Sequence, residues 1–280
     1  MAIKMDGKAL AEKMRAQIRE EAAQLPRKPA LAVILVGEDP ASQVYVRNKE
    51  KDCAECGIRS EGYRLPAETS EQQLLELIAV LNQNDAVDGI LVQLPLPKHI
   101  SQEKVIHAIY PDKDVDAFHP FNVGKIVTGE PGFLPCTPAG VMELLRAYDI
   151  SAAGKNCVIV GRSNIVGKPM ALLLLREHGT VTICHSRTAD LAAETSRADI
   201  LVAAVGKTGL ITGDMVKEGA VVIDVAMNRN EAGKLCGDCL YDEVAEKASY
   251  ITPVPGGVGP MTRLILMKNT LSAAKNHIGV

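Results

Sequence analysis

Hydrophobic and polar positions follow two alternating patterns along most of the 280-residue chain. Short apolar runs rich in β-branched residues predict strands, and apolar residues three or four positions apart predict amphipathic helices. In the first half, strands are predicted at 31–36, 58–65 and 89–94, and helices at 7–24, 41–56 and 71–84. Ser70 and Gln73 are spaced as a capping box for the last of these helices. Strands separated by helices favour right-handed crossovers and a parallel sheet.

The second half repeats this alternation after a segment without clear periodicity. Residues 111–138, rich in Pro, Gly and Asp, predict a loop that crosses between domains. Thr137 and Pro138 then predict the start of a helix that runs to about residue 148. Strands are expected at 157–160, 181–184, 200–205, 221–225 and 250–254, and a final helix at about 264–275. Because these strands are continuously apolar, we expect them to be buried on both faces.

These elements predict an α/β protein with two α/β domains and a cleft between them. The C-terminal domain is expected to be a Rossmann-like, doubly wound parallel sheet. We place the first domain at residues 1–119 together with the C-terminal helix at 264–280, and the second domain at residues 120–263.

Composition and charge argue against several classes of protein. The chain carries 31 Lys and Arg against 34 Asp and Glu, dispersed along its length, so nucleic-acid binding is not expected. The first residues lack the apolar run of a secretory signal, and no apolar run approaches the roughly 18 residues of a membrane span. Seven cysteines in a chain of this length do not suggest a disulfide framework. We therefore expect a cytoplasmic protein that binds no membrane.

Two Cys-x-x-Cys pairs, Cys53/Cys56 and Cys236/Cys239, raise the alternative of a zinc site. No His follows either pair at ligand spacing, although four cysteines from two distant segments could still meet in space. Small buried or partly exposed thiols are the simpler interpretation. We predict no metal site, and we assign no catalytic role to any of the six histidines.

A loop bounded by glycines, Gly161–Gly167, lies between a predicted strand and a predicted helix that runs through Arg176. The first glycine permits a tight turn, and the start of the helix offers free N–H groups and a positive dipole end to a phosphate. Ser163 replaces the middle glycine of the usual Gly-x-Gly-x-x-Gly pattern, so this motif alone is a weak signal. An ordinary strand-to-helix turn is the alternative.

The residues after the next predicted strand bear on the type of nucleotide. A fold that binds NAD usually places Asp or Glu there to hold the ribose 2′-hydroxyl. This chain has His185, Ser186 and Arg187 instead, and a hydroxyl beside a guanidinium suits a 2′-phosphate. Arg162 supplies a second cation. The pattern predicts NADP as the cofactor in preference to NAD.

Three further segments carry candidate chemistry. Tyr45 and Lys49 stand four residues apart on one face of a predicted helix, where an isolated lysine is usually only a solvated surface residue. Gln93 ends a predicted strand and can reach a ligand, because ligands of open α/β sheets bind beyond the carboxyl ends of the strands. Asp116 lies in the long central loop, where acids are also common in turns. The segment Pro253–Pro260 is stiffened by prolines, and its glycines allow a flat ligand to approach the backbone.

A Tyr-x-x-x-Lys pair is also found in short-chain dehydrogenases, but there it follows the glycine loop, whereas here it precedes that loop. Six motifs in the same order instead resemble those of bifunctional methylenetetrahydrofolate dehydrogenase/cyclohydrolase over nearly the whole chain. The matching segments are Tyr45–Lys49, Gly89–Leu96, Pro111–Asp116, Pro135–Pro138, Gly161–Pro169 and Pro253–Thr262.

This resemblance implies a role for each candidate residue. Lys49 would be the catalytic lysine, positioned by Tyr45 and hydrogen-bonded by Gln93, and Asp116 would hold the pterin ring of folate. The substrate would be bordered by the loop that contains Pro255, Gly256 and Gly257. NADP would be contacted by Gly161, Arg162, Ser163, Ser186 and Met227, and the charge argument adds Arg187. The chain departs from the family pattern at Ala117 and Ala226, where glycine is usual, and at Met227, where a smaller or branched residue is usual.

The implied activity has two steps. NADP takes a hydride from methylenetetrahydrofolate, and water then opens the methenyl product to 10-formyltetrahydrofolate. Lys49 could act in the second step as a base or as a charged positioning group, and the sequence leaves both open. The resemblance further implies that the first domain binds folate, that the second binds NADP, and that the protein is a homodimer through the second domain.

Other functions are consistent with parts of this pattern. A monofunctional NAD(P)-dependent methylenetetrahydrofolate dehydrogenase would share the fold and lack hydrolysis. A non-catalytic NADP-binding protein of the same fold is a second alternative. An amino-acid or shikimate-type dehydrogenase shares the two-domain layout but lacks the folate-loop residues.

Overall fold

The computed structural model describes residues 2–130 and 132–280, apart from the side chain of Ala41. The chain divides into two compact units. The three-stranded unit consists of residues 13–125, 130–134 and 263–280, and the six-stranded unit of residues 2–12, 126–129 and 135–262. The two-domain α/β architecture is therefore confirmed. This division differs from the predicted boundaries mainly at the N-terminus, where residues 2–12 go with the six-stranded unit.

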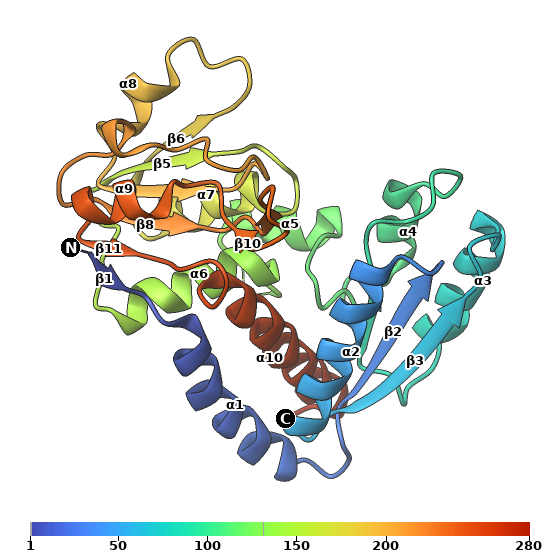
Figure 1. Cartoon of the computed structure of the whole chain (residues 1–280). Coiled ribbons are helices and arrows are strands. Elements are labelled where there is room, and N and C mark those ends of the chain that lie inside the picture. Colours follow the sequence, from blue (N-terminus) through green and yellow to red (C-terminus); the bar gives the residue numbers. More distant parts are fainter. Residues whose placement is uncertain (1, 131) are drawn as a thin grey trace. The chain divides into compact units, whose positions relative to one another are not determined.

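The three-stranded unit contains a parallel sheet in the order β3-β2-β4. Its strands are β2 (Ala30–Val36), β3 (Arg59–Leu65) and β4 (Gly89–Val92), and its helices include α2 (Pro40–Glu55), α3 (Glu71–Asn82), α4 (Gln102–Ala108) and most of α1 (Gly7–Ala23). All residues of the central strand β2 and of the edge strand β4 are buried, whereas the other edge strand, β3, is partly exposed. In Figure 1, β2 and β3 run side by side with α2 along them.

Helix starts in this unit follow the local capping rules. The side chain of Asp39 accepts a hydrogen bond from the N–H of Ser42 at 2.7 Å and caps α2, whose first residue is Pro40. Ser70 and Gln73 form the predicted capping box of α3, with each side chain bonded to the backbone of the other residue. These caps determine where α2 and α3 begin after the preceding strands.

The six-stranded unit contains a parallel sheet in the order β1-β11-β8-β7-β5-β6. The strands are β1 (Ile3–Lys4), β5 (Asn156–Val160), β6 (Thr180–Cys184), β7 (Ile200–Ala203), β8 (Val221–Asp224) and β11 (Tyr250–Ile251). A short antiparallel pair, β9 (Asn228–Arg229) and β10 (Leu235–Cys236), follows β8. The strands β5 and β6 lie side by side in Figure 1, with β6 at the edge. The reversal of strand order at β5 is the arrangement expected of a doubly wound sheet.

Helices and one 3-10 turn connect these strands. They are α6 (Cys136–Ala147), α7 (Gly167–Arg176), α8 (Leu191–Thr195), the 3-10 turn η1 (Gly213–Met215) and α9 (Tyr241–Lys247). A buried cluster that includes Val160, Leu201 and Val222 lies on the sheet. β1 joins the sheet beside β11, which explains why the N-terminal residues belong to this unit.

The structure corrects three predictions about helices. The segment predicted as a continuous loop contains α5 (Pro120–Thr128). The helix expected to start at Thr137 already begins at Cys136, its N-cap is Pro135, and the Thr137 hydroxyl lies 3.0 Å from that of Thr262 instead. The final helix, α10, spans Val258–Ile278 and therefore begins within the predicted Pro253–Pro260 loop.

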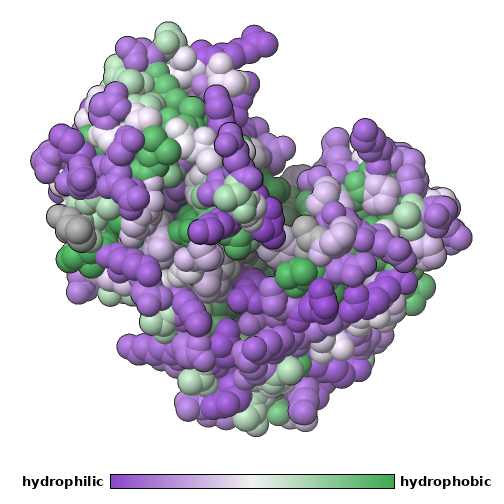
Figure 2. Space-filling model, in the orientation of Figure 1, coloured by the Kyte–Doolittle hydropathy of each residue, from purple (hydrophilic) through white to green (hydrophobic). Residues whose placement is uncertain are grey.

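All seven cysteines are free thiols, and only Cys236 among them is not fully buried. Burial raises the pKa of Cys53 and of Cys56 to about 12, which disfavours the thiolate that a zinc site requires. In the described part of the chain, no three His, Cys, Asp or Glu side chains are grouped to hold a metal ion. None of the helices described is long and apolar enough to cross a membrane. The face drawn in Figure 2 is mostly hydrophilic, with apolar residues in small patches.

Candidate functional site

The three-stranded unit brings Lys49 and Gln93 together. Lys49 lies in α2, and its Nζ donates a hydrogen bond to Oε1 of Gln93 at 3.0 Å. The Nε2 of Gln93 donates to the carbonyl of Leu94 at 2.6 Å, and its backbone N–H donates to the carbonyl of Ile34 at 2.8 Å. Because both the main chain and the side-chain amide are held, the oxygen of Gln93 is the atom presented to the lysine. The predicted pair is therefore brought together at the carboxyl end of β4.

The helix that carries Lys49 is oriented by its buried face. Val46 and Cys53 are buried, and Tyr45, one turn before Lys49, has 37% of its surface exposed. Near the end of the helix, the buried carboxylate of Asp52 forms ion pairs with Arg15 at 3.1 Å and Arg263 at 3.1 Å. These contacts hold α2 so that Tyr45 and Lys49 occupy an accessible side.

Asp116 lies in a loop anchored by the residues before it. Lys113 is buried, and its ammonium donates to the carbonyls of Leu81 at 3.1 Å and Asn84 at 2.8 Å, at the end of α3. Desolvation by burial lowers the pKa of Lys113. Val115 is fully buried, and its carbonyl accepts a hydrogen bond from the side chain of Asn269 at 2.8 Å. The loop is therefore fixed by the residue before Asp114 and by the residue between Asp114 and Asp116.

A second acid, Asp114, shapes the turn after Asp116. Its carboxylate accepts hydrogen bonds from the Asn122 amide at 2.9 Å and from the N–H of His119 at 2.8 Å. Burial raises the pKa of Asp114 to about 6, although these hydrogen bonds favour the ionised form. Ala117, where glycine is usual in the resembling family, adopts a φ of 59° and is fully buried. The partly buried Asp116 thus lies on a turn that imposes a left-handed conformation on its neighbour.

In the six-stranded unit, the predicted nucleotide loop connects β5 to α7. Gly161 has a φ of 132°, and a Cβ at this position would overlap the carbonyl oxygen of Ala204. A Cβ on Gly167 would overlap the carbonyl oxygen of Gly161. Both glycines are needed for this close backbone approach at the start of α7.

Ser163 has a structural function in this loop. Its hydroxyl accepts hydrogen bonds from the N–H groups of Val166 at 3.1 Å and Gly167 at 3.2 Å. The serine at the usual glycine position therefore stabilises the turn into α7 in the manner of a helix cap. Arg162 and Ser163 are both exposed, so they can contact a nucleotide.

The segment after β6 presents the groups predicted for a 2′-phosphate. Ser186 and Arg187 are exposed, and the N–H of Arg187 donates to Nδ1 of His185 at 3.1 Å. The N–H of His185 donates to the hydroxyl of Thr188 at 2.8 Å, which closes the turn. Met227, between β8 and β9, is 42% exposed. With the two close-packed glycines and the exposed Arg162, this donor set fits NADP, with its 2′-phosphate beside Ser186 and Arg187.

The Pro255–Gly257 loop also belongs to the six-stranded unit. The N–H of Gly257 donates to the carbonyl of Pro253 at 2.9 Å, and the carbonyl of Gly256 accepts from the N–H of Lys8 at 3.0 Å. Pro255 is exposed, Gly256 is partly buried and Gly257 is buried. The loop is therefore tightly held, and its proline is the part that a ligand can reach.

The sequence analysis missed two buried acids in this unit. Asp224 ends β8, and Asp238 follows β10; their exposures are 3% and 0%. Asp224 was placed inside an apolar strand, and Asp238 lies in a segment without periodicity. Their buried state could be recognised only once their partners were known.

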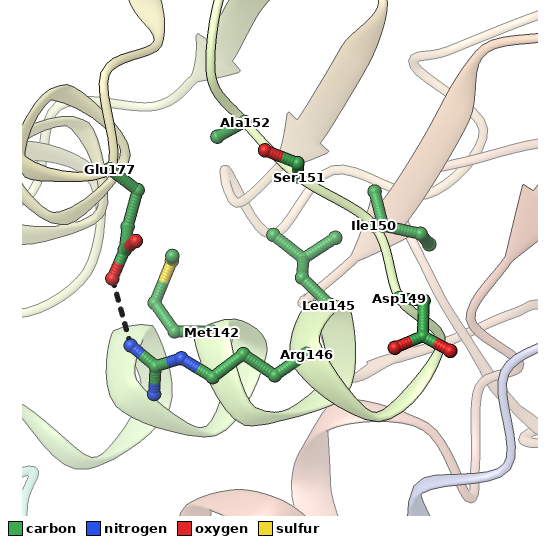
Figure 3. A pocket seen from close by; sticks show the side chains of 8 residues that line it. All are labelled: Met142, Leu145, Arg146, Asp149, Ile150, Ser151, Ala152 and Glu177. Atoms are coloured by element: carbon green, nitrogen blue, oxygen red, sulfur yellow. Dashed lines mark hydrogen bonds and ion pairs between the residues drawn. The ribbon is translucent and has the colours of Figure 1, made fainter.

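A surface depression of about 300 Å³ lies elsewhere in the six-stranded unit. Figure 3 shows it beside the end of α6 and the residue that follows α7, with the Arg146–Glu177 ion pair, 2.9 Å long, on one side. None of the predicted site residues lines it. It provides no chemistry for the candidate site.

Comparisons with known proteins identify relatives along almost the full chain. Residues 5–116 match the family described as "Tetrahydrofolate dehydrogenase/cyclohydrolase, catalytic domain", and residues 135–278 match its "NAD(P)-binding domain". The "Bifunctional protein FolD" of Magnetococcus marinus is 59% identical over 279 residues, covering 98% of each chain.

Solved structures agree with these matches. The bifunctional methylenetetrahydrofolate dehydrogenase/cyclohydrolase FolD of Campylobacter jejuni superposes with a TM-score of 0.97 at 51% identity, over 99% of each chain. A Trypanosoma brucei dehydrogenase-cyclohydrolase, solved with NADP and an inhibitor, has a TM-score of 0.95 at 40% identity. That match covers 100% of this chain and 99% of the other.

Proposed function

Because the chain belongs to the tetrahydrofolate dehydrogenase/cyclohydrolase family, we propose that Lys49, Tyr45, Gln93 and Asp116 form its folate site. The chain is an NADP-dependent methylenetetrahydrofolate dehydrogenase and methenyltetrahydrofolate cyclohydrolase. In this proposal the three-stranded unit binds folate and the six-stranded unit binds NADP, with Pro255, Gly256 and Gly257 bordering the substrate.

The cofactor assignment rests on residues of the six-stranded unit. When bound, NADP accepts the hydride that leaves the one-carbon bridge of the substrate. The proposal gives Gly161 and Ser163 contacts to the dinucleotide backbone, and Arg162, Ser186 and Arg187 contacts to the 2′-phosphate. Met227, exposed between β8 and β9, offers an apolar contact surface. These residues bind and orient the cofactor, which is how a protein contributes to hydride transfer.

The second step is assigned to Lys49. Water adds to the methenyl carbon, a proton leaves that water, and the ring opens to the formyl product. The amine of Lys49 is held by Gln93 and lies one helical turn from Tyr45, so it is the positioned group available to accept or orient that proton. Asp116 would hold the pterin through hydrogen bonds to its carboxylate. The observation that carries the proposal is the 3.0 Å contact between Lys49 and Gln93.

The test is a pair of turnover assays on the purified protein. Hydrolysis of methenyltetrahydrofolate is measured without nucleotide, and oxidation of methylenetetrahydrofolate is measured separately with NADP and with NAD. Turnover in both assays, with NADP preferred, is expected. Oxidation without hydrolysis would instead identify a monofunctional dehydrogenase, and NADP binding without either turnover would identify a non-catalytic protein.

Two further properties belong to this proposal. We propose a homodimer formed through the six-stranded unit, as the resemblance implies, and a cytoplasmic location. Sedimentation of the purified protein at the mass of a monomer, 29.9 kDa, would contradict the first. Fractionation of the producing cells tests the second, and recovery outside the cytoplasm would contradict it.

A further inference from the structure

Three consecutive backbone amides after β7 point to one carboxylate. Asp238 accepts hydrogen bonds from the N–H groups of Val205 at 2.7 Å, Gly206 at 3.2 Å and Lys207 at 2.6 Å. A fourth comes from the side-chain amide of Asn228 at 2.9 Å. The outer side of residues 205–207 is exposed, whereas Asp238 is completely buried. A single buried carboxylate therefore links the loop after β7 to the segment after β8.

Asp238 is itself fixed by a second buried carboxylate. Asp224 accepts hydrogen bonds from the N–H groups of Asp238 at 3.0 Å and Cys239 at 2.8 Å. A Cβ at Gly237 would overlap the carboxylate of Asp224, so only glycine permits this close approach. Asp224 thus fixes the main chain at Asp238 and at the residues directly before and after it.

The loop held by Asp238 adjoins the nucleotide loop. Ala203 pairs with Val160, the N–H of Ala204 donates to the carbonyl of Val160 at 2.8 Å, and Gly161 packs directly against the carbonyl of Ala204. In the sheet order, β6 lies on one side of β5, and β7 and β8 lie on the other. A dinucleotide lies across the carboxyl ends of such strands. If the 2′-phosphate of NADP lies at the carboxyl end of β6, the nicotinamide half of NADP lies at the carboxyl ends of β7 and β8.

Successive backbone N–H groups are a common binding arrangement for phosphate. Here the three amides of residues 205–207 already bond to Asp238, so this loop is unsuited to hold a phosphate. We propose that Asp238 is a positioning residue that shapes the binding surface for the nicotinamide half of NADP. It acts through residues 205–207 and Asn228, and it does not itself contact the cofactor. The inference rests on the NADP dependence stated above.

The test uses Asp238→Asn in the full-length protein. An Asn side chain has the same shape, but an NH2 group replaces one of the two carboxylate oxygens. Because both oxygens accept hydrogen bonds from N–H groups, this NH2 group faces N–H donors in either orientation of the amide, and those donors lose their acceptor. Calorimetric titration compares NADP with 2′,5′-ADP, which contains the adenosine and its 2′-phosphate but no nicotinamide. We expect the Kd for NADP to rise at least ten-fold and the Kd for 2′,5′-ADP to stay within two-fold of the wild-type value.

Two controls separate this effect from general damage. Hydrolysis of methenyltetrahydrofolate without nucleotide should be the same in Asp238→Asn as in the wild type. If the wild type itself showed no hydrolysis, that result would count against the proposed function and not against this inference. Asp242→Asn removes an exposed carboxylate four residues away and should change neither Kd.

Unchanged NADP affinity in Asp238→Asn, or equal weakening of both ligands, would overturn the proposal. If Asp238→Asn binds no 2′,5′-ADP because the unit does not fold, Asn228→Ala decides the question. This variant removes one of the four hydrogen bonds to Asp238 and a bond to the Gly237 carbonyl, and we expect a smaller shift confined to NADP. If the Kd for NADP in Asn228→Ala did not rise selectively, that result would also overturn the proposal.

Discussion

Nζ of Lys49 and Oε1 of Gln93 lie 3.0 Å apart, although 44 residues separate them in the sequence. The contact joins a side chain of α2 to the residue that follows β4. Because Gln93 also donates to the neighbouring Leu94 carbonyl, its acceptor oxygen is directed at the amine. Gln93 therefore gives the amine a fixed partner before a substrate binds, which is a form of the preorganisation that catalysis benefits from.

Lys49→Met removes the amine and keeps much of the side-chain length. If Lys49 takes part in proton transfer, methenyltetrahydrofolate hydrolysis should fall by at least about 100-fold, while folate binding and part of the hydride transfer are retained. Steady-state assays of both steps and a folate titration provide the measurement. Lys51→Met is the matched control, because the side chain of Lys51 in the same helix is 73% exposed. Loss of both folate and NADP binding in Lys49→Met would show that the lysine is structural.

Gln93→Leu removes the acceptor at similar volume. A hydrogen bond to a charged group contributes about 1.5–3 kcal/mol, so we expect kcat for hydrolysis to fall by roughly 10- to 100-fold. KM for folate should change much less, since the glutamine acts on the amine. The comparison of kcat with KM is the measurement. An increase in KM alone would place Gln93 in substrate binding instead.

Arg162→Ala tests the nucleotide assignment. Loss of a cation that pairs with a phosphate should raise the Kd for NADP by about 10-fold or more and affect NAD much less. Fluorescence titrations with both nucleotides measure the ratio. Arg176→Ala, exposed at the other end of α7, is the control. Equal weakening of NADP and NAD would contradict a contact to the 2′-phosphate.

Asp88 should make the three-stranded unit sensitive to acid. It is completely buried and accepts hydrogen bonds from Arg27, from His277 and from the N–H of Ala30. Burial opposes ionisation, but these hydrogen bonds outweigh it and lower the pKa of Asp88. A lowered folded-state pKa contributes stability above the unfolded value of about 3.9, and this contribution is lost as the pH falls through the folded-state pKa.

Asp88→Asn should therefore lower the free energy of unfolding by roughly 2–4 kcal/mol at pH 7, since Arg27 is partly solvated and recovers some hydration. The difference from the wild type should shrink as the pH falls below about 4. Urea unfolding at several pH values measures it. Asp85→Asn, exposed nearby, is the control. A difference that does not depend on pH would show that shape, rather than charge, is responsible.

The buried strands were the most predictable part of the fold. β2 and β7 are continuous apolar runs, and every residue in them is buried, so their hydrophobicity alone indicated their place. Short elements were not predictable in this way. β1 contains two residues, was not predicted, and exists because it pairs with β11, whereas β11 was predicted at 250–254 and spans only Tyr250–Ile251. α5 begins at Pro120 and contains Gly124, and both residues suggested a loop.

The candidate site was predictable to a different extent in each part. The contact between Lys49 and Gln93 was expected from the family resemblance, and the pattern of the sequence by itself indicated only that Gln93 lies at the carboxyl end of a strand. Thr137 followed the pattern of a helix cap, yet its hydroxyl meets Thr262, 125 residues away. Asp238 could not be recognised, because its three amide partners lie 31 to 33 residues away and backbone groups leave no sequence signal.

The distribution of thiols has a practical consequence. Six cysteines are buried, while Cys236 is partly accessible, and its Sγ lies 3.6 Å from the hydroxyl of Thr208, next to the loop that Asp238 holds. A maleimide dye added to the unmodified protein should therefore react with Cys236 alone. The fluorescence of this dye would report NADP binding in real time, and no cysteine would have to be introduced.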